Sequence, residues 1–283
     1  MKLKPTETGQ KTTQKSNILT TNNNKALSIQ INLSGLSFCI LNQDERKIEL
    51  LQDIPFGKKH TPFEVLEQLK SALDDNDSFN ANFNAVTIIY QNELSNLVPK
   101  ELFNENNCAD YLKFNAKILK SDFISFDYLK TEDTVNVYVP LVNINNFIFE
   151  RFGEFEYKHA STVFIDTTLQ NTSQTPSIHI NVNANTFEIL VTENSKILLY
   201  NTFEYTTKED FIYYILFTVE QLKLDPETVK LLLSGHLLKD DALYNIAYKY
   251  IRHVDFVTPK YPFTFTYNLS MTHQNYIILN SFN

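Results

Sequence analysis

Histidine and cysteine, the side chains that most often bind metals or act as nucleophilic pairs, number six and two in this 283-residue chain and lie far apart. No two of the six histidines have the HxH, HxxH or HExxH spacing that would place them on one metal ion. His179 occupies a polar position in an alternating strand pattern, and we expect it to face solvent. No GxSxG motif marks a serine hydrolase. The sequence therefore predicts neither a local metal site nor a hydrolase triad. The histidines are His60, His159, His179, His236, His253 and His273.

Glycine is scarce, with 5 residues in the whole chain. Phosphate-binding loops of the GxGxxG and GxxxxGK[ST] types need glycines close together, because the backbone must approach the phosphate. Neither pattern occurs here. Rossmann dehydrogenases, P-loop ATPases and protein kinases are therefore poor candidates. The five are Gly9, Gly35, Gly57, Gly153 and Gly235.

Charge and apolar content point to a protein that does not bind nucleic acid and does not span a membrane. The formal net charge is −8, which disfavours a partner with a phosphate backbone. Residues 1–25 lack the apolar core of a signal peptide, and the longest apolar stretch, Phe211–Phe217, is far short of a membrane span. Cys39 lies in an apolar run and is predicted to be a buried strand residue; with Cys108 it forms no disulfide framework. We expect a cytoplasmic protein without a membrane span.

A pattern of three strands, a helix and a further strand opens the ordered part of the chain. Alternating apolar residues predict the first strand, and the Thr61–Pro62 pair predicts the start of the helix. The predicted strands are Leu27–Leu33, Phe38–Leu41, Lys47–Phe56 and Asn84–Tyr90, with the helix running from Thr61 to Leu73.

The same pattern recurs after a linker at residues 171–176. We therefore predict a disordered tail at 1–26, a first domain at 27–172 and a second domain at 173–283 that includes a C-terminal extension. The repeated elements are strands at Ile178–Val182, Phe187–Thr192, Lys196–Phe203 and Val229–Leu233, with a helix that Thr207 caps before the last of them.

The intervening and final segments contain further expected elements. Asp166–Thr168 is expected on a solvated helix face, and one of Tyr213 and Tyr214 should be exposed because both cannot face inwards. The elements are a short helix at Asp110–Phe114, a hairpin at Phe123–Tyr128 and Thr134–Val139, a helix from Pro140 to Phe152, a strand at Phe155–His159, a helix capped by Ser161, a turn at Ser234–Gly235, a helix at Asp240–Ile251 and a strand at Val254–Val257.

The duplicated unit resembles the actin, sugar-kinase and Hsp70 ATPase fold over residues 27–260. The chain more closely resembles an uncharacterised family typical of Bacteroidota with that fold, through Leu27–Ile31, Asp210–Tyr214 and Leu232–Gly235. Val135–Phe152 is similar to type IV pilus actin-like assembly proteins. The resemblance implies an α/β protein with two ribonuclease H-like domains and a cleft between them.

The resemblance also implies a phosphate-binding hairpin in each half, where active members carry Asp for Mg²⁺ and Gly for close backbone approach. Here Asn32 and Asn181 stand at the Asp positions. Ser34, followed by Gly35, and Asn183 stand at the glycine turns. The turn that would lie beside adenine reads Ser234-Gly235-His236 and has one glycine instead of two.

These departures remove both carboxylates that would neutralise Mg²⁺, on which phosphoryl transfer depends. We therefore expect a non-catalytic protein with a degenerate nucleotide site, no cofactor, and a binding or scaffolding role toward another protein. Enzymatic activity is not fixed by the sequence, although its absence is favoured. Two alternatives remain: a divergent actin-like ATPase that binds ATP with Mg²⁺, and a small-ligand sensor that uses the interdomain cleft.

Overall fold

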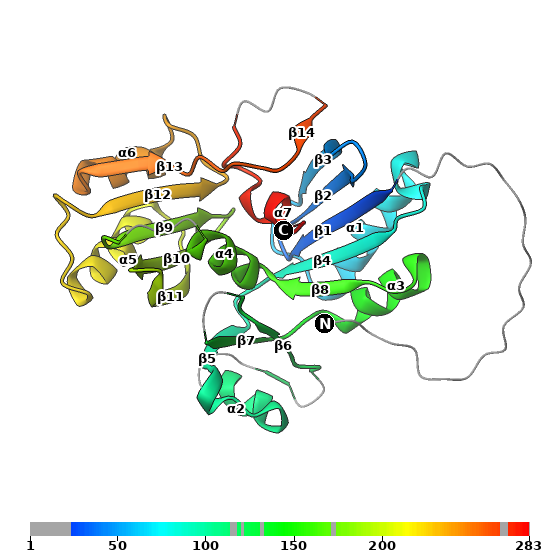
Figure 1. The fold of residues 1–283 in the computed structure, drawn as a ribbon, viewed down its shortest axis with the longest axis horizontal. Coiled ribbons are helices and arrows are strands. Elements are labelled where there is room, and N and C mark those ends of the chain that lie inside the picture. The colour runs from blue at the N-terminus through cyan, green and yellow to red at the C-terminus, as the bar shows by residue number, and fades with distance from the viewer. Residues whose placement is uncertain are drawn as a thin grey trace, which may run out of the picture. The chain divides into compact units, whose positions relative to one another are not determined.

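The computed structural model describes residues 24–113, 118–119, 122–130, 133–170, 174–266 and 271–282. These residues form two compact units that interleave along the chain (Figure 1). Unit 1 takes its described residues from Met1–Tyr90, Leu141–Lys158 and Pro262–Tyr267. Unit 2 takes its described residues from Gln91–Pro140, His159–Tyr261 and Asn268–Asn283.

A six-stranded sheet with the order β14-β3-β2-β1-β4-β8 forms the centre of unit 1. β1 pairs antiparallel with β2 and β2 with β3, whereas β14 joins β3 in parallel, so the sheet is mixed. The strands are β1 Lys25–Asn32, β2 Gly35–Asn42, β3 Lys47–Pro55, β4 Ala85–Gln91, β8 Glu156–His159 and β14 Thr264–Phe265. The helices of this part of the chain are α1 Pro62–Asp74, η1 Asp77–Asn80 and α3 Val142–Phe152.

The ends of α1 and α3 follow from local sequence. Thr61 and Glu64 form a capping box at the start of α1, and Pro62 takes the first helical position. Gly153 ends α3 with a φ of +80°, which glycine adopts without steric cost. Arg151 of α3 donates to Asp74 at the end of α1 and so ties the two helices together.

A five-stranded sheet with the order β11-β10-β9-β12-β13 forms the larger part of unit 2. β9, β10 and β11 are an antiparallel meander, and β12 adds to β9 in parallel. The strands are β9 Ser177–Val182, β10 Thr186–Glu193, β11 Lys196–Glu204, β12 Lys230–Gly235 and β13 His253–Phe256. The helices are α4 Ala160–Leu169, α5 Lys208–Gln221, α6 Ala242–Tyr250 and α7 Tyr276–Asn280.

A three-stranded antiparallel sheet with the order β5-β7-β6 completes unit 2. It has its own small core, in which Leu112, Val135 and Val137 are fully buried. Its elements are β5 Ser95–Pro99, η2 Lys100–Leu102, η3 Glu105–Asn107, α2 Cys108–Leu112, β6 Ser125–Tyr128 and β7 Thr134–Tyr138.

The predicted duplication is confirmed by the sheet topology. β1 and β9 lie in separate mixed sheets, and β3-β2-β1-β4-β8 repeats the strand order of β11-β10-β9-β12-β13. The domain bounds predicted from the repeat, with a division at residue 172, stay a prediction. The contact-based units follow a different division, because residues 91–140 and His159–Leu169 group with unit 2.

Several local predictions were wrong. Residues 1–23 of the predicted disordered tail lie outside the described residues, but Lys25 and Ala26 already belong to β1. His159, rather than Ser161, caps α4, because its Nδ1 accepts from the Ser161 N–H. Ser234 and Gly235 form the end of β12 rather than a turn, since both pair in parallel with β9.

Burial explains two further corrections. His179 is 7% exposed rather than facing solvent, because both faces of its sheet are covered. The Asp166–Thr168 segment lies in a helix, as predicted, but every residue of α4 is buried, so its face is not solvated. Tyr213 is the exposed member of the tyrosine pair on α5. Of the predicted linker, 171–173 lie outside the described residues.

Candidate functional site

The second of the two predicted phosphate hairpins, β9–β10, contains a buried amide–carboxylate pair. Asn181 on β9 and Glu188 on β10 are direct cross-strand partners. The Asn181 Nδ2 group donates to Glu188 Oε2 at 2.6 Å, and each residue is 2% exposed. A carboxylate therefore stands beside the position where Asn replaces the expected Asp.

Three further side chains join this pair to form what we call the polar cluster: Gln91, Asn181, Asn183, Glu188 and Ser234. Gln91 Nε2, at the end of β4, donates to Asn183 Oδ1 at 3.0 Å and to Glu188 Oε2 at 3.4 Å. Ser234 Oγ, on β12, lies 3.0 Å from the Ile180 carbonyl oxygen and 3.2 Å from Asn181 Oδ1. All five residues are buried and belong to unit 2.

Burial controls the protonation of the polar cluster. It raises the pKa of Glu188 to about 7, although hydrogen bonds from Asn181 and Gln91 favour the carboxylate and oppose the shift. Burial also raises the pKa of Tyr200 on β11, and the negative charge of Glu188 adds to that effect. The cluster can therefore gain or release a proton near neutral pH. The Asn181 and Gln91 amides donate to acceptors within the cluster, whereas Asn183 Nδ2 is buried and makes no hydrogen bond.

The first predicted phosphate hairpin, β1–β2, turns through Leu33 and Ser34 in unit 1. The Asn32 side chain closes this turn, because its Oδ1 accepts from the Ser34 N–H at 2.8 Å. The turn's carbonyl groups are engaged as well: Ser34 O accepts from Phe56 N and Leu33 O accepts from His60 N. A Cβ at Gly35 would press on the Ile54 carbonyl oxygen of β3, so packing within the sheet already accounts for this glycine.

The predicted adenine-side residues divide between burial and exposure. Ser234 is fully buried, whereas His236 is exposed. Gly235 has a φ of +89° and lies against the backbone of Val182, where a Cβ would clash. Its N–H donates to the His273 carbonyl, and the His236 N–H donates to the Val182 carbonyl. This strand end is therefore fastened to β9 and to the segment that precedes α7.

The structure thus brings together part of the predicted site. Asn181, Asn183 and Ser234 meet in the polar cluster, and Gly235 follows directly. Asn32, Ser34 and Gly35 belong to unit 1, so their predicted position opposite Asn181 across a cleft stays a prediction.

Sequence reasoning missed Glu188 and Gln91. Glu188 did carry a signal, since it is the one charged residue in the apolar run Phe187–Val191. A charge in such a run is buried on folding and needs hydrogen-bonding partners. Gln91 gave no comparable signal, because its contacts with Asn183 and Glu188 span more than 90 residues of sequence.

A second buried polar network lies at the start of α4. Asp127 accepts from the His159 backbone N–H, from Thr162 Oγ1 and from the Tyr138 hydroxyl. The His159 ring Nδ1 accepts from the Ser161 backbone N–H, so Nε2 carries the proton and donates to the Asn92 carbonyl. Burial lowers the pKa of His159 to about 4 and raises that of Asp127. Ser161 is fully buried, so its hydroxyl is not accessible as a nucleophile. The network stabilises the start of α4.

Metal ligation finds no support in the described ranges. No group of three or more His, Cys, Asp or Glu side chains there could hold a metal ion. Asp74 and Asp75 are exposed at the end of α1, where Asp74 pairs with Arg151 and Asp75 accepts from the Ser71 hydroxyl.

Comparison with protein families gives one match, to a family described as "Protein of unknown function (DUF3822)", over residues 14–254. A search of curated proteins found no match.

Solved structures show the fold. A Bacteroides thetaiotaomicron protein described as having an actin-like ATPase fold and unknown function aligns with a TM-score of 0.74 and 23% identity, over 83% of this chain and 91% of that one. The structure of a PilM–PilN type IV pilus biogenesis complex aligns with a TM-score of 0.59 and 11% identity, over 90% and 96%. The chain therefore has an actin-like ATPase fold, as the resemblance implied, and a distant similarity to PilM.

Proposed function

The chain belongs to the DUF3822 family, whose description assigns no role, and we propose that it is a non-catalytic actin-like protein that binds another protein. The actin-like fold alone does not determine whether the protein is an enzyme, since one fold serves many activities. The proposal depends on the chemistry of the two hairpins that would hold nucleotide in an active relative.

The hydrogen bonding of the polar cluster is the observation that carries this proposal. In an active hairpin, backbone and side-chain N–H groups are free to donate hydrogen bonds to phosphate oxygens. Here the Asn181 amide donates to Glu188, and Gln91 donates to Asn183 and Glu188. A phosphate would have to break these buried bonds and replace each of them.

Charge opposes a nucleotide at the same place. The pKa of Glu188, raised by burial to about 7, leaves a substantial fraction ionised at neutral pH, and a phosphate would be repelled. No positive charge contributes to the shift of Glu188, so no described cation compensates. Glu188 is also a lone carboxylate, whereas two would be needed to replace the lost pair. The residues of this hairpin therefore do not fit a Mg²⁺-nucleotide.

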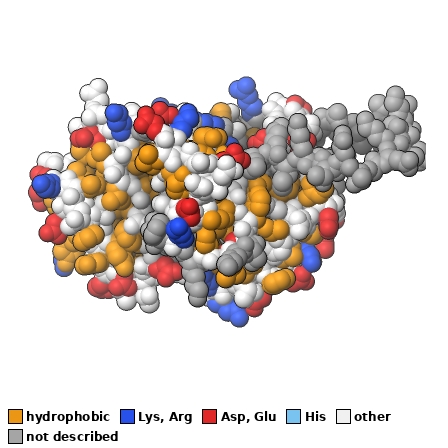
Figure 2. Space-filling model, turned by 90° about the horizontal axis from the view of Figure 1, so that it is seen from below, with side chains coloured by type: hydrophobic (Ala, Val, Ile, Leu, Met, Phe, Trp, Pro, Cys, Tyr) orange, Lys and Arg blue, Asp and Glu red, His pale blue; other side chains and the backbone are white. Residues whose placement is uncertain are grey.

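Two observations support a protein as the partner. PilM, a protein of the same fold, is described in complex with PilN. Figure 2 shows hydrophobic side chains on one face among interspersed acidic and basic ones, without a continuous basic field. Such a mixed surface suits a protein partner better than a nucleic acid. None of the described helices is long and apolar enough to cross a membrane.

Calorimetry tests the absence of nucleotide binding. The full chain is titrated with ATP and with ADP, each with and without Mg²⁺, and an active actin-like ATPase serves as the positive control. We expect no heat of binding and no shift in melting temperature up to millimolar nucleotide. Micromolar ATP binding would favour the divergent ATPase instead.

The ligand-sensor alternative makes a different prediction. A small-molecule sensor would gain thermal stability from a metabolite other than a nucleotide, which a thermal-shift screen of metabolites would detect. The partner-binding proposal predicts no such ligand. It predicts instead that in-cell crosslinking recovers one protein reproducibly, and that the reconstituted pair forms a stoichiometric complex. The cytoplasmic location expected from the sequence is part of this proposal.

A further inference from the structure

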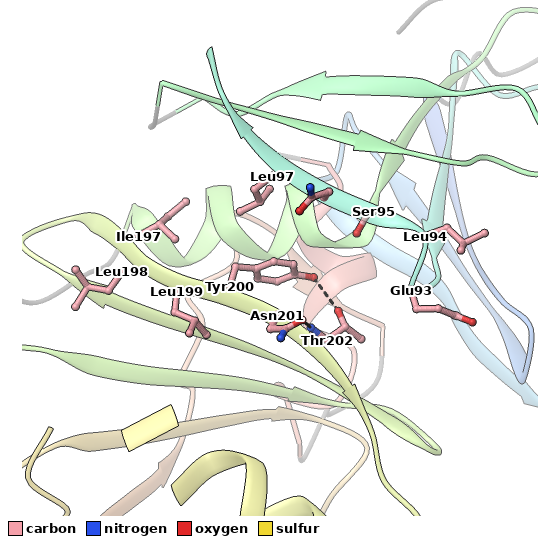
Figure 3. A pocket seen from close by; sticks show the side chains of 11 residues that line it. Glu93, Leu94, Ser95, Leu97, Ile197, Leu198, Leu199, Tyr200, Asn201 and Thr202 are labelled. Carbon is pink, nitrogen blue, oxygen red and sulfur yellow. Dashed lines mark hydrogen bonds between the residues drawn. The ribbon is translucent and has the colours of Figure 1, made fainter. Parts of the chain in front are cut away.

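Two sheet edges in unit 2 line one cavity of about 950 Å³ (Figure 3). β11 is the outer strand of the five-stranded sheet, and β5 is the outer strand of the three-stranded sheet. The cavity is lined by Glu93–Leu97 on one side and Ile197–Thr202 on the other. A cavity of this size is at the upper end of ordinary ligand pockets.

The hydrogen-bond register shows which backbone groups of β11 point into the cavity. Tyr205 N donates to Asn185 O, which makes this a hydrogen-bonded pair of the β10–β11 ladder. Such pairs alternate along antiparallel strands, so Phe203 and Asn201 also bond toward β10, while Tyr200 and Thr202 direct their N–H and C=O groups outward. The Thr202 N–H donates to the neighbouring Asn201 Oδ1, as an edge amide without a strand partner can.

The same argument fixes the direction of β5. Val139 N donates to Leu94 O, and Lys100 N donates to Asp133 O, so the even-numbered residues of β5 bond toward β7. Ser95 and Leu97 therefore direct their backbone groups outward. Pro99 has no N–H to offer, and it ends the usable edge. Two strands thus present backbone donors and acceptors to one space.

We propose that this cavity, called here the edge groove, binds an extended segment of the partner protein as an added β-strand. The segment pairs with β11 through the outward groups of Tyr200 and Thr202, and it lies against Ser95 and Leu97 of β5. Main-chain pairing supplies affinity in such complexes, and side-chain pockets supply specificity. This inference rests on the protein-binding role proposed above and assigns the place and the form of the bound segment.

The lining residues specify the chemistry of the segment. Leu97, Ile197 and Leu198 offer apolar contacts, whereas the Leu199 side chain packs against the core of the five-stranded sheet. Alternate residues of a bound strand face the same side, so every second residue should be apolar.

The size of the groove favours a single chain over a second copy of this protein. Six residues of extended chain span about 20 Å, which matches the Ile197–Thr202 wall. The edge strand of a folded copy would bring its whole sheet with it, and a cavity walled on two sides leaves no room for that sheet. The occupant is therefore a linear segment.

Peptide selection on the intact chain tests the inference. A displayed library of random eight-residue peptides is selected against the full-length protein, and the recovered peptides are synthesised with a fluorescent label. We expect alternating apolar residues. N-methylation of alternate peptide amides should abolish binding, because it removes the donors of the ladder.

Edge-proline variants locate the site. Leu97→Pro and Thr202→Pro each remove an outward N–H that the sheet does not use, and each should weaken the selected peptides by roughly tenfold, the loss of one or two hydrogen bonds. Tyr128→Pro is the matched control, at the opposite edge of the same three-stranded sheet. Leu129 N donates to Thr134 O, so the backbone N–H of the neighbouring Tyr128 is directed away from β7. This variant should leave binding unchanged. Melting temperatures check that all three variants fold.

Hydrogen exchange on the unmodified protein gives a readout that needs no variant. Bound peptide should slow exchange at Leu97 and Tyr200, while the inward amides of Asn201 and Phe203 stay unchanged. Peptides that protect other amides, a selection that recovers no peptide, or a dimer that shields these amides without peptide would each overturn the edge groove. None of these results would overturn the partner-binding function, which fails instead if the intact chain binds ATP.

Discussion

Asn181 donates its side-chain amide to the carboxylate of Glu188 on the neighbouring strand, 2.6 Å away and out of contact with solvent. The bond joins the residue that replaces a metal-holding Asp to a carboxylate on the second strand of the same hairpin. It explains why Asn suits this position: an amide can donate to Glu188, whereas an Asp carboxylate would repel it.

Removing the charge of Glu188 should stabilise the protein at alkaline pH. Burial raises its pKa in the folded state to about 7 from the ordinary 4.5, so ionisation costs folding free energy as pH rises between these values. We expect Glu188→Gln to raise the free energy of unfolding by about 1–3 kcal/mol at pH 8 and by little at pH 4.5. Urea unfolding at both pH values measures this, with exposed Glu220→Gln as control. An equal effect at both pH values would contradict the assignment.

Restoring the expected aspartate should be harmful in one hairpin and harmless in the other. Asn181→Asp would place two carboxylates in contact in a buried site, and we expect a loss of about 3 kcal/mol or more at pH 8. Asn32→Asp should cost almost nothing, because an Asp oxygen also accepts from the Ser34 N–H. Denaturant unfolding compares the two variants, and ATP titration of the double variant should still give no binding. Equal stability of the two single variants would refute the arrangement of the polar cluster.

Acid should destabilise unit 2 through His179. Burial lowers its pKa in the folded state to about 4, below the ordinary value of 6.5. The unfolded chain therefore binds the proton first, and stability is lost as pH falls from 6.5 toward 4. His179→Phe should reduce the loss of stability between pH 7 and pH 5 by about 1–2 kcal/mol. His253→Phe, at an exposed position of β13, is the control. An unchanged pH profile in the His179 variant would contradict the lowered pKa of His179.

Two glycines with similar backbone angles should respond differently to alanine. Gly235 has a φ of +89° and would place a Cβ against the Val182 backbone, so Gly235→Ala should cost about 2–4 kcal/mol. Gly57 has a φ of +73° and open space around it, so Gly57→Ala should cost only about 1 kcal/mol. Thermal and urea unfolding distinguish the two. A similar loss in both would mean that β12 does not approach β9 as closely as described.

The duplicated strand–strand–strand–helix–strand unit could be read from local pattern. Alternation at Ile178–Val182 and the capping residues Thr61 and Thr207 each act within a few residues, so β9, α1 and α5 begin close to the predicted positions. The resemblance to actin-like proteins extended the pattern to a fold, and the absence of Asp from both hairpins was visible in the chain itself.

Contacts between segments that are distant in the sequence were decided by the tertiary structure and not by local sequence pattern. His179 looked solvent-facing because alternation predicts a polar outer face, but a strand covered on both faces buries every residue. The local sequence predicts Ser234 in a turn, but Ser234 pairs with β9 as part of β12. Glu188 and Gln91 are far apart in the sequence and meet only in the folded chain. The outward amides of Leu97 and Tyr200 line one cavity only because the edges of two sheets both face it. Each of these depends on the path of the chain through space, which the period of a single segment does not encode.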